Sequence, residues 1–415
     1  MGPPDPRALD ARLDRTSERP LAVAFSGGGD SLALLLAAKI WADRVGRRVV
    51  ALTVDHRLQP ESGKWAAWCA ERAAGLGVDH RILAWEGPKP PTGLAAAARA
   101  ARHRLIAEAA RQAGARVVLV GHTADDVLES EVMRAGGVRI TNPREWSPSP
   151  VWPEGREIFL LRPLLAARRA GLRAWLTALG ETWIEDPANL DPRQPRARAR
   201  AEIAGGRLAS TTEEEPILTP TQLFGFGPAG DVMLYSDLAG DPEFLDRLGA
   251  AVVCASGGER MPRRDALVRL GARLEREETL SVTLGGARIV RAGQRIHVVR
   301  ETGDSRGRPC EPVNLPAGES VIWDGRYEVG AKEGGLTLAP LAGRAARLGE
   351  EARRRLSVRH PAVRKAFPVL IDEQGNVTCP TLEADPRVEI RNLIPNRMAG
   401  ACSIIGGEAE IGLFD

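Results

Sequence analysis

The sequence predicts an α/β protein whose first half forms a doubly wound parallel sheet. Two observations support this fold class. From residue 21 to about residue 180, short apolar segments alternate with segments of helical periodicity, which is typical of parallel strands joined by helices. Three consecutive glycines stand between the first apolar segment and the first helical one. Glycines at such a turn let the backbone approach a ligand closely.

Five strands and five helices are expected in this part of the chain. The predicted strands are residues 21–25, 48–54, 78–84, 116–121 and 157–161. The predicted helices are residues 31–45, 62–75, 93–113, 124–135 and 166–179. Ligands of such sheets bind beyond the carboxyl ends of the strands. The residues that directly follow a strand are therefore the first candidates for a site.

The chain divides into four predicted parts. We expect a flexible N-terminus at residues 1–20, the doubly wound domain at 21–205, a mixed and partly helical connecting region at 206–278, and a small β-rich C-terminal domain at 279–415. Helical patterns near residues 242–250 and 261–276 fall in the connecting region.

Turn signals mark these divisions. Gly205-Gly206 and the acidic run at residues 213–216 indicate a linker or an exposed turn. Asp324-Gly325 between two short apolar segments predicts a β-hairpin in the last domain. Residues 139–156 are rich in Pro, Trp and Ser and carry no period, so we expect a long loop that acts as a lid.

Composition limits the function classes. The net charge of +3 on 415 residues gives no overall signal for nucleic-acid binding. The five cysteines are odd in number and form no C-x-x-C pair, which favours free thiols in a reducing cytoplasm. The first residues do not resemble a signal peptide, and no apolar run is long enough to span a membrane. We therefore expect a cytoplasmic protein without membrane contact.

The segment Ser26-Gly27-Gly28-Gly29-Asp30-Ser31 carries the strongest chemical signal. Its backbone N–H groups, together with the start of the next helix, can hold a pyrophosphate, and both serines can add hydroxyl donors. Asp30 would repel phosphates unless Mg²⁺ lies between them. The lysine of the P-loop that cleaves a γ-phosphate is missing. The alternative is a glycine-rich turn without a ligand.

A second polar group follows predicted strand 116–121. It contains His122, Asp125 and Asp126, and Glu129 lies three residues further on the same helix face. Three carboxylates in one place need a cation, either Mg²⁺ or an amine substrate. The alternatives are that Asp125 only caps the helix and that Glu129 pairs with Arg134 or faces solvent. Asp55 and His56 follow another strand and can line the nucleotide site.

Further sequence fragments follow the glycine loop in a defined order along the chain. They are residues 54–62, 98–103, 162–165 and 183–191, followed by Arg196, Arg198 and Arg200 at alternate positions. Together with the 26–31 loop, this series resembles the tRNA(Ile)-lysidine synthetases of the PP-loop ATP pyrophosphatase superfamily. The resemblance is close over residues 21–200. It is weaker over 280–380, where residues 323–326 and 367–372 carry it.

The resemblance implies a fold, a reaction and roles for residues. The fold is the adenine nucleotide α-hydrolase type, with residues 21–205 as the ATP-binding catalytic domain. ATP adenylates the wobble cytidine of a tRNA(Ile) with a CAU anticodon, and free L-lysine then displaces AMP at C2 to give lysidine, with ATP as co-substrate and Mg²⁺ as cofactor. The C-terminal domain would also contact the tRNA.

The implied site residues fall into five groups. Those for catalysis are Asp30, Asp126 and His122; for ATP, Ser26, Gly27, Gly28, Gly29, Asp30, Ser31, Asp55 and His56; for lysine, Glu129 and Asp125; for tRNA, Arg99, Arg102, Arg196, Arg198 and Arg200; and for the metal, Asp30 and Asp126.

The chain departs from the family pattern at three places. Arg102-His103 stands where the family commonly has Arg-Tyr, Arg196-Ala197-Arg198 where it has Arg-Asn-Arg, and Gly136-Gly137 lacks the usual serine. These departures concern tRNA contact and leave the ATP chemistry unaffected.

Other functions remain open at this stage. One is another PP-loop enzyme that adenylates its substrate, either a tRNA-modifying or an amide-forming one. Sulfur transfer is disfavoured, because only Cys69 lies in the first domain. A nucleotide- or RNA-binding module without catalysis is the non-enzyme alternative. The basic run at residues 353–365 either contacts tRNA phosphates or forms a solvated helix face. The oligomeric state is open, with a homodimer as one alternative.

Overall fold

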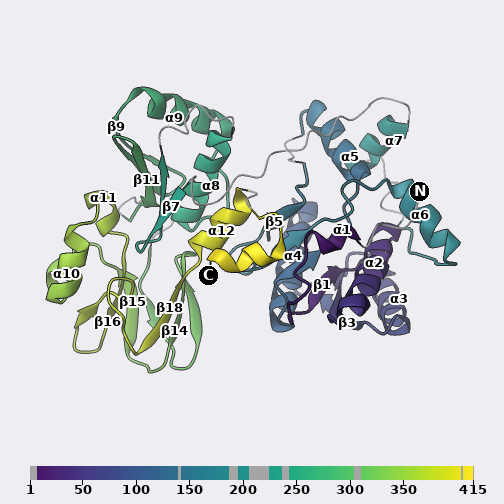
Figure 1. The fold of residues 1–415 in the computed structure, drawn as a ribbon, viewed down its shortest axis with the longest axis horizontal. Coiled ribbons are helices and arrows are strands. Elements are labelled where there is room, and N and C mark those ends of the chain that lie inside the picture. The colour runs from purple at the N-terminus through teal and green to yellow at the C-terminus, as the bar shows by residue number, and fades with distance from the viewer. Residues whose placement is uncertain are drawn as a thin grey trace. The chain divides into compact units, whose positions relative to one another are not determined.

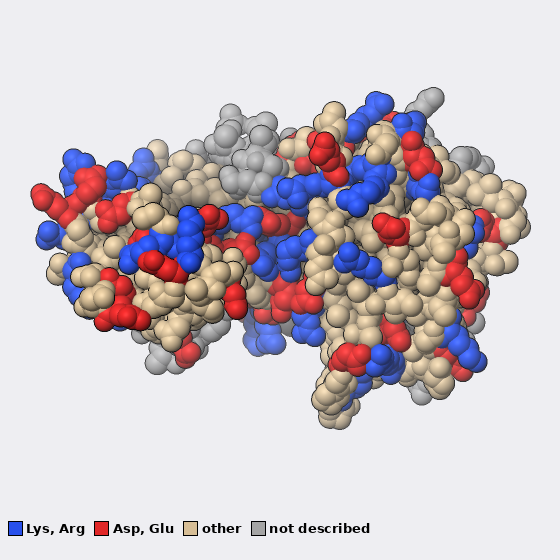
Figure 2. All heavy atoms as spheres, turned by 90° about the horizontal axis from the view of Figure 1, so that it is seen from below, with Lys and Arg blue, Asp and Glu red and all other residues tan. Residues whose placement is uncertain are grey.

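The computed structural model describes residues 7–138, 142–186, 195–204, 224–235, 243–302, 310–402 and 405–414. The chain forms two compact units, one made of residues 1–217 and 405–413 and the other of residues 218–404 and 414–415. Figure 1 shows the helices and strands of each. On the face drawn in Figure 2, basic and acidic side chains are interspersed, in keeping with the small net charge. No helix in the described ranges has the length and apolar character to cross a membrane.

The first unit contains a six-stranded sheet in the order β3-β2-β1-β4-β6-β5. Five strands run parallel: β1 (Leu21–Ala24), β2 (Val49–Asp55), β3 (Asp79–Ala84), β4 (Val117–Leu119) and β6 (Phe159–Leu161). These are the five strands that the sequence predicts. The expected number of strands is wrong by one, because β5 (Trp146–Pro148) pairs antiparallel with β6. It is three residues long and lies within the predicted loop, so no alternation reveals it.

Helices cover both faces of this sheet, which confirms the doubly wound class. The helices of this unit are α2 (Gly29–Val45), α3 (Ser62–Gly75), α4 (Leu94–Gln112), α5 (Ala124–Ala135), α6 (Arg169–Ala178) and α7 (Pro195–Ala204). Helices α2, α3 and α4 pack on the strands, whereas α6 packs against α2 and α7 against α5. Ala22 and Val118 pack with Ile106 of α4 in one buried cluster. Since side chains alternate along a strand, the buried Leu21 and Val23 face the opposite side.

Residues 7–20 are more ordered than the sequence predicts. Helix α1 (Arg7–Asp10) begins the described chain, and Leu9 and Leu13 are buried. The indole Nε1 of Trp41 donates a hydrogen bond to Asp10 at 2.9 Å. Residues 1–6 lie outside the described ranges. The 3₁₀ segment η5 (Glu408–Phe414) closes the chain, and residues 405–413 belong to this first unit.

The second unit begins with a five-stranded antiparallel sheet in the order β7-β8-β11-β10-β9. Its strands are β7 (Phe224–Gly227), β8 (Asp231–Tyr235), β9 (Thr279–Leu284), β10 (Ala287–Ala292) and β11 (Arg295–Arg300). Helices α8 (Phe244–Ser256), α9 (Arg264–Arg276) and α12 (Ile394–Ala401) share its core. Because β8 pairs with β11, the boundary that we expected at residue 278 does not separate two bodies.

Two small sheets complete the second unit, in the orders β12-β15-β16-β17 and β13-β14-β18. Their strands are β12 (Val313–Leu315), β13 (Ser320–Trp323), β14 (Tyr327–Ala331), β15 (Leu336–Pro340), β16 (Pro368–Ile371), β17 (Val377–Thr378) and β18 (Val388–Asn392). The segments η4 (Ala345–Arg347), α10 (Glu350–Ser357) and α11 (Pro361–Arg364) accompany them. Asp324 and Gly325 have φ angles of +50° and +66°, so the predicted hairpin is confirmed. The β-rich character of this region is confirmed as well.

Candidate active site

The glycine loop joins β1 to α2 as the sequence predicts. Gly28 is the N-cap of α2 and has no side chain to cap the helix, so the first N–H groups of α2 can bind an anion. The Ser31 hydroxyl donates to the Gly28 carbonyl at 2.9 Å and lies 3.2 Å from the Ser26 hydroxyl. These bonds hold the loop in a fixed shape. Ser26 is exposed, whereas Ser31 is buried.

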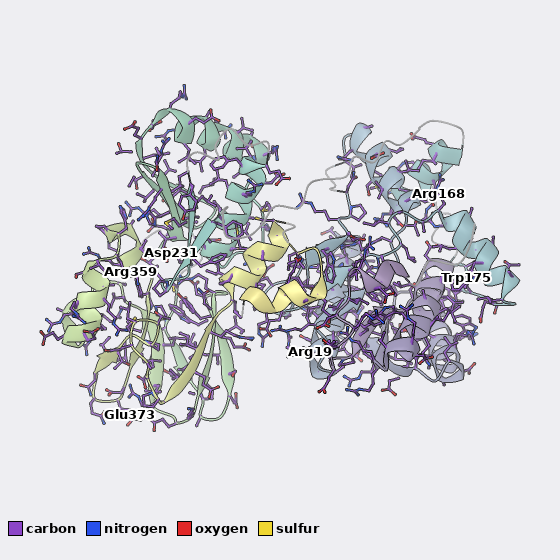
Figure 3. The ribbon with its side chains drawn as sticks, viewed as in Figure 1. Arg19, Arg168, Trp175, Asp231, Arg359 and Glu373 are labelled. Atoms are coloured by element: carbon purple, nitrogen blue, oxygen red, sulfur yellow. The ribbon has the colours of Figure 1, made fainter. Side chains whose placement is uncertain are left out.

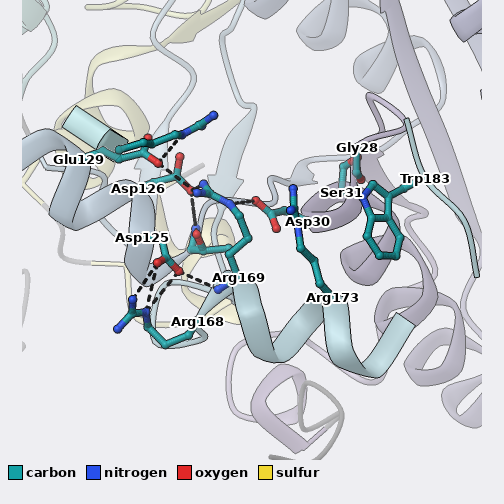
Figure 4. Close-up of polar contacts among 12 residues, drawn as sticks. Gly28, Asp30, Ser31, Asp125, Asp126, Glu129, Arg168, Arg169, Arg173 and Trp183 are labelled. Atoms are coloured by element: carbon teal, nitrogen blue, oxygen red, sulfur yellow. Dashed lines mark hydrogen bonds and ion pairs between the residues drawn. The ribbon is translucent and has the colours of Figure 1, made fainter. Parts of the chain in front are cut away.

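A segment after α6 lies against this loop. The Ile184 N–H donates to the Gly27 carbonyl at 2.9 Å, and a Cβ added at Gly29 would lie 3.5 Å from the Trp183 ring. The indole of Trp183 donates to Glu185 at 2.7 Å and lies under the Arg173 guanidinium at 5.8 Å. Figure 4 shows Trp183 beside Gly28 and Ser31. Trp183 belongs to one of the family fragments, but no sequence pattern indicated this position beside the loop.

Helix α5 begins with a capping box made by Thr123 and Asp126. Oδ2 of Asp126 accepts from the Thr123 N–H and from its hydroxyl, both at 2.9 Å. The capping aspartate is therefore Asp126 and not Asp125, which the sequence alternative named. Asp126 and Glu129 are both buried. The alternative in which Glu129 pairs with Arg134 or faces solvent is wrong, because its side chain has an exposed fraction of 0%.

Arg169, the first residue of α6, bridges three of the predicted carboxylates (Figure 4). Its Nε lies 2.9 Å from Oδ2 of Asp30, its Nη1 3.0 Å from Oε1 of Glu129, and its Nη2 3.5 Å from Oδ2 of Asp126. The 26–31 loop and the 121–129 segment therefore meet, as their positions at strand ends predict. Burial raises the pKa of Asp30, while the hydrogen bond from Arg169 opposes this rise.

Three further arginines surround the carboxylates. Arg168 binds Asp125 with its Nε and Nη2, the shortest distance being 2.9 Å. On α7, Arg196 lies 3.5 Å from Oδ1 of Asp126, and Arg200 lies 2.7 Å from Oε1 of Glu129. Arg198, between them, is exposed. Two of the arginines predicted for tRNA thus contact acidic site residues in this structure.

His122 lies at the edge of this cluster. Its Nδ1 accepts a hydrogen bond from Nε of Arg162 at 2.9 Å. Burial lowers the pKa of His122, against the opposing charge of Asp126, so the ring is neutral near pH 7 and carries its proton on Nε2. Arg162 belongs to a family fragment, but no sequence pattern identified it as a partner of His122.

Arg99 and Arg102 on α4 add positive charge. Burial, with the charges of Arg99 and Arg196, lowers the pKa of Arg102 to about 10. Within the described ranges, no acidic side chain forms an ion pair with Arg99 or Arg102. Like charges held together without acidic partners are suited to bind an anion.

Asp55 is the last residue of β2 and His56 follows it, and both take local partners. Oδ1 of Asp55 accepts from the Arg57 N–H at 2.9 Å. The His56 ring packs edge-on against Trp85 with 6.0 Å between centroids. Both residues lie at the carboxyl end of β2, which pairs with β1.

The residues around Asp30 fit a magnesium ion that also binds phosphates. Within the described ranges, no group of three or more His, Cys, Asp and Glu side chains could hold a metal by itself. Mg²⁺ in nucleotide sites typically takes one or two carboxylates and completes its shell with phosphates and waters. Oδ1 of Asp30 is buried and has no hydrogen-bond partner among the residues that the structure describes, and it lies beside the amides at the start of α2. Asp126 fits less well, because both of its oxygens already have partners.

Comparisons with known proteins agree with this geometry. A family described as a PP-loop domain matches residues 4–205. The tRNA(Ile)-lysidine synthase of Caulobacter vibrioides is 46% identical over 408 residues, which cover 97% of this chain and 98% of that protein. The enzyme of the same name from Hyphomonas neptunium is 35% identical over 352 residues, 79% of this chain and 93% of that protein.

Among solved structures, a U34-tRNA thiolase from Methanococcus maripaludis aligns with a TM-score of 0.41 and 13% identity, over 48% of this chain and 71% of that one. A similarity this low does not bear on function. The fold, the glycine loop and the family match define a PP-loop protein. By its identity to relatives over 97% and 79% of its length, the chain belongs to the tRNA(Ile)-lysidine synthase family.

Proposed function

We propose that this chain is a ligase that joins free L-lysine to C2 of the wobble cytidine in a CAU-anticodon tRNA(Ile). ATP first adenylates O2 of that cytidine and releases diphosphate. The ε-amine of lysine then forms a C–N bond at C2 and loses a proton, while the C2–O2 bond breaks and AMP leaves with that oxygen. The observation that carries this proposal is that Arg169 contacts both Asp30 of the glycine loop and the buried carboxylate of Glu129. The loop and the buried acids thus form one site. The relatives favour it over another PP-loop reaction.

The ATP step is supported by the loop at residues 26–31. The uncapped start of α2 can hold the pyrophosphate, and Oδ1 of Asp30 can hold Mg²⁺. When bound there, Mg²⁺ supplies charge neutralisation at the phosphates. His122, with its proton on Nε2, can donate a hydrogen bond to a developing anion. Asp55 and His56 stay proposed members of the nucleotide site.

The lysine step is supported by Glu129. Its Oε2 is buried and has no hydrogen-bond partner among the described residues, which suits it to bind an ammonium and then accept its proton. Asp125 suits this role less, because Arg168 and the backbone N–H of Arg169 bind its two oxygens. We therefore propose that Glu129 binds lysine. Asp125 instead holds the start of α6 in place.

The tRNA contacts are supported by basic side chains in both units. In the first unit these are Arg99, Arg102 and Arg198. In the second unit, Arg295, Arg359 and Arg364 line a cleft of about 630 Å³, together with His297 and His360, whose rings stack at 5.1 Å. Figure 3 marks Asp231 and Arg359 of this cleft. Phosphate contacts there would add affinity without reading sequence. A cytoplasmic location and a homodimer stay predictions.

Incubation with labelled lysine, ATP, Mg²⁺ and a tRNA(Ile) transcript tests the reaction, followed by digestion to nucleosides. The proposal predicts labelled lysidine that depends on both ATP and the CAU anticodon. A transcript in which the wobble cytidine is replaced by uridine is the matched control. If neither transcript yields a labelled nucleoside although the protein is intact and folded, the proposal is refuted.

A further inference from the structure

Arg169 is the central contact of the carboxylate group, and no sequence pattern pointed to it. Its three guanidinium nitrogens each contact a different acid: Asp30, Glu129 and Asp126. A planar fork can make such contacts in three directions, whereas a lysine ammonium is a single point of charge. The side chain is 19% exposed, so these contacts are largely removed from water.

The contacts occupy one oxygen of each outer carboxylate. Arg169 binds Oδ2 of Asp30, and Oδ1 has no hydrogen-bond partner in the described chain. It binds Oε1 of Glu129, as Arg200 does, and Oε2 has none. Asp126 differs, since Thr123 and Arg196 engage its two oxygens. Among the described residues, Oδ1 of Asp30 and Oε2 of Glu129 therefore remain without a partner, on two sides of the Arg169 guanidinium (Figure 4).

Arg169 is held in place by its own backbone. Its N–H donates to Oδ2 of Asp125 at 2.7 Å, and the same carboxylate binds the guanidinium of Arg168. Asp125 thus fixes the start of α6, from which the Arg169 side chain extends towards the other three acids. Hydrogen bonding to Asp30 and the nearby negative charges raise the pKa of Arg169 despite its burial, so it stays charged.

We infer that Arg169 is a positioning residue that divides one carboxylate group into two cation half-sites, a metal half-site at Asp30 and an ammonium half-site at Glu129. The inference rests on the proposed function for the identity of the two cations. A single unbroken group of acids would attract a divalent ion to its centre and exclude lysine. A fixed monovalent cation at that centre lowers the affinity for a free metal ion and leaves one oxygen for each ligand.

The test uses Arg169→Gln, which removes the charge and keeps much of the length. Arg44→Gln is the matched control, because it removes the same charge, whereas Arg44 pairs with Asp10 of α1 and with none of the site carboxylates. Mn²⁺ alone is the probe, with binding to the full chain followed by the electron paramagnetic resonance of unbound Mn²⁺. Arg169→Gln should bind Mn²⁺ on the order of tenfold more tightly than wild type, and Arg44→Gln should not differ from wild type.

A second readout separates positioning from a merely structural role. With ATP saturated by Mg²⁺, the lysine KM of the wild type should not change as excess Mg²⁺ rises. In Arg169→Gln, the lysine KM should rise with Mg²⁺, because the metal can now reach Glu129. Unchanged Mn²⁺ binding, or a lysine KM that ignores Mg²⁺ in this variant, would overturn the inference.

Arg169→Lys keeps the inference refutable if the glutamine variant does not fold. One ammonium cannot bridge three carboxylates, so its lysine KM should still depend on Mg²⁺, and independence would contradict the inference. The Mn²⁺ measurement needs no turnover. It therefore tests the role of Arg169 even if the wild-type protein forms no lysidine. Absence of lysidine would refute only the proposed function.

Discussion

Arg47 and Glu408 form a buried ion pair across 361 positions of the chain. Nη1 and Nη2 of Arg47 lie 2.6 Å and 2.5 Å from the two oxygens of Glu408, and the side chains are 1% and 7% exposed. The Glu408 N–H also donates to the Arg12 carbonyl at 2.8 Å. Residues 405–413 are thus part of the unit that holds the candidate active site.

Glu408→Gln should destabilise this unit, because it leaves the Arg47 guanidinium buried without its charge partner. Breaking a buried pair in this way costs about 3–5 kcal/mol, which lowers Tm by on the order of 10 °C in a unit of this size. Thermal melting followed by circular dichroism measures the change. Asp43→Asn is the control, since Asp43 is 61% exposed in its pair with Lys39. Equal melting of the two variants would show that the buried pair contributes little.

Gly27→Ala should abolish ATP binding without unfolding the protein. Gly27 has a φ angle of +82°, and an added Cβ would overlap Ile184 and Cys69, so the loop must change shape. Titration of ATP by calorimetry checks this expectation. Gly63→Ala is the control, because a Cβ built there meets no described atom within 4 Å outside its chain neighbours and the backbone of its own helix. ATP binding of wild-type strength in Gly27→Ala would mean that the loop tolerates another conformation.

His103 should make the protein less stable in mild acid. Burial lowers its pKa to about 3, whereas an unfolded chain protonates histidine near pH 6.5. The unfolded state therefore binds more protons between these values, and stability falls as pH falls, by up to about 1.4 kcal/mol per pH unit. His103→Phe should show a shallower loss of the free energy of unfolding between pH 6.5 and 4.5 in urea titrations. Arg104→Gln, an exposed neighbour, should keep the wild-type slope; equal slopes in both variants would contradict the prediction.

Arg99→Ala and Arg198→Ala should each weaken tRNA binding and reduce its salt dependence. Both side chains are exposed, and removing one ion pair with a phosphate reduces the slope of log K against log salt by about one unit. Arg200→Ala should instead keep the slope and lower the rate, since Arg200 binds Glu129. Filter binding over a range of salt concentrations measures the slopes. If all three variants show the same slope, Arg99 and Arg198 do not differ from Arg200 in their contact with tRNA phosphates.

The sequence predicted the first unit well because local patterns determine its elements. Apolar runs and helical periods located β1 and α2, and the glycine loop located the site. Arg169 could not be predicted in the same way. It is separated from Glu129 by 40 positions, and nothing in the 166–179 helical pattern indicates which acids it meets. Contacts between distant segments follow from how helices pack on the sheet, and residue types alone do not specify that packing.

Arg326 shows the same limit in the second unit. The sequence predicted its hairpin from Asp324-Gly325, but an arginine is rarely buried. Here the side chain is 0% exposed. It binds Asp324 at 3.0 Å and the Ala229 carbonyl at 2.7 Å, while Arg300 binds the same aspartate. The family fragment at residues 323–326 thus joins β11, the turn before β8 and the hairpin, a structural role that its composition does not reveal.

Substituting the acid of each half-site should slow a different step of the reaction. Asp30→Asn should reduce tRNA-dependent release of diphosphate by on the order of 10²–10³, because Asp30 serves the ATP step. Folding should survive, which thermal melting checks. Diphosphate release at the wild-type rate in a folded Asp30→Asn protein would remove Asp30 from the metal half-site.

Steady-state kinetics of Glu129→Gln, with adenylation and lysine transfer followed separately, tests the central claim most directly. The account predicts that the lysine KM rises on the order of tenfold or more, the cost of losing a charged hydrogen bond. It also predicts that the ATP KM stays near wild type and that diphosphate release in the presence of tRNA remains detectable. Loss of ATP use with an unchanged lysine KM would contradict it and place Glu129 with Asp30 in the metal half-site.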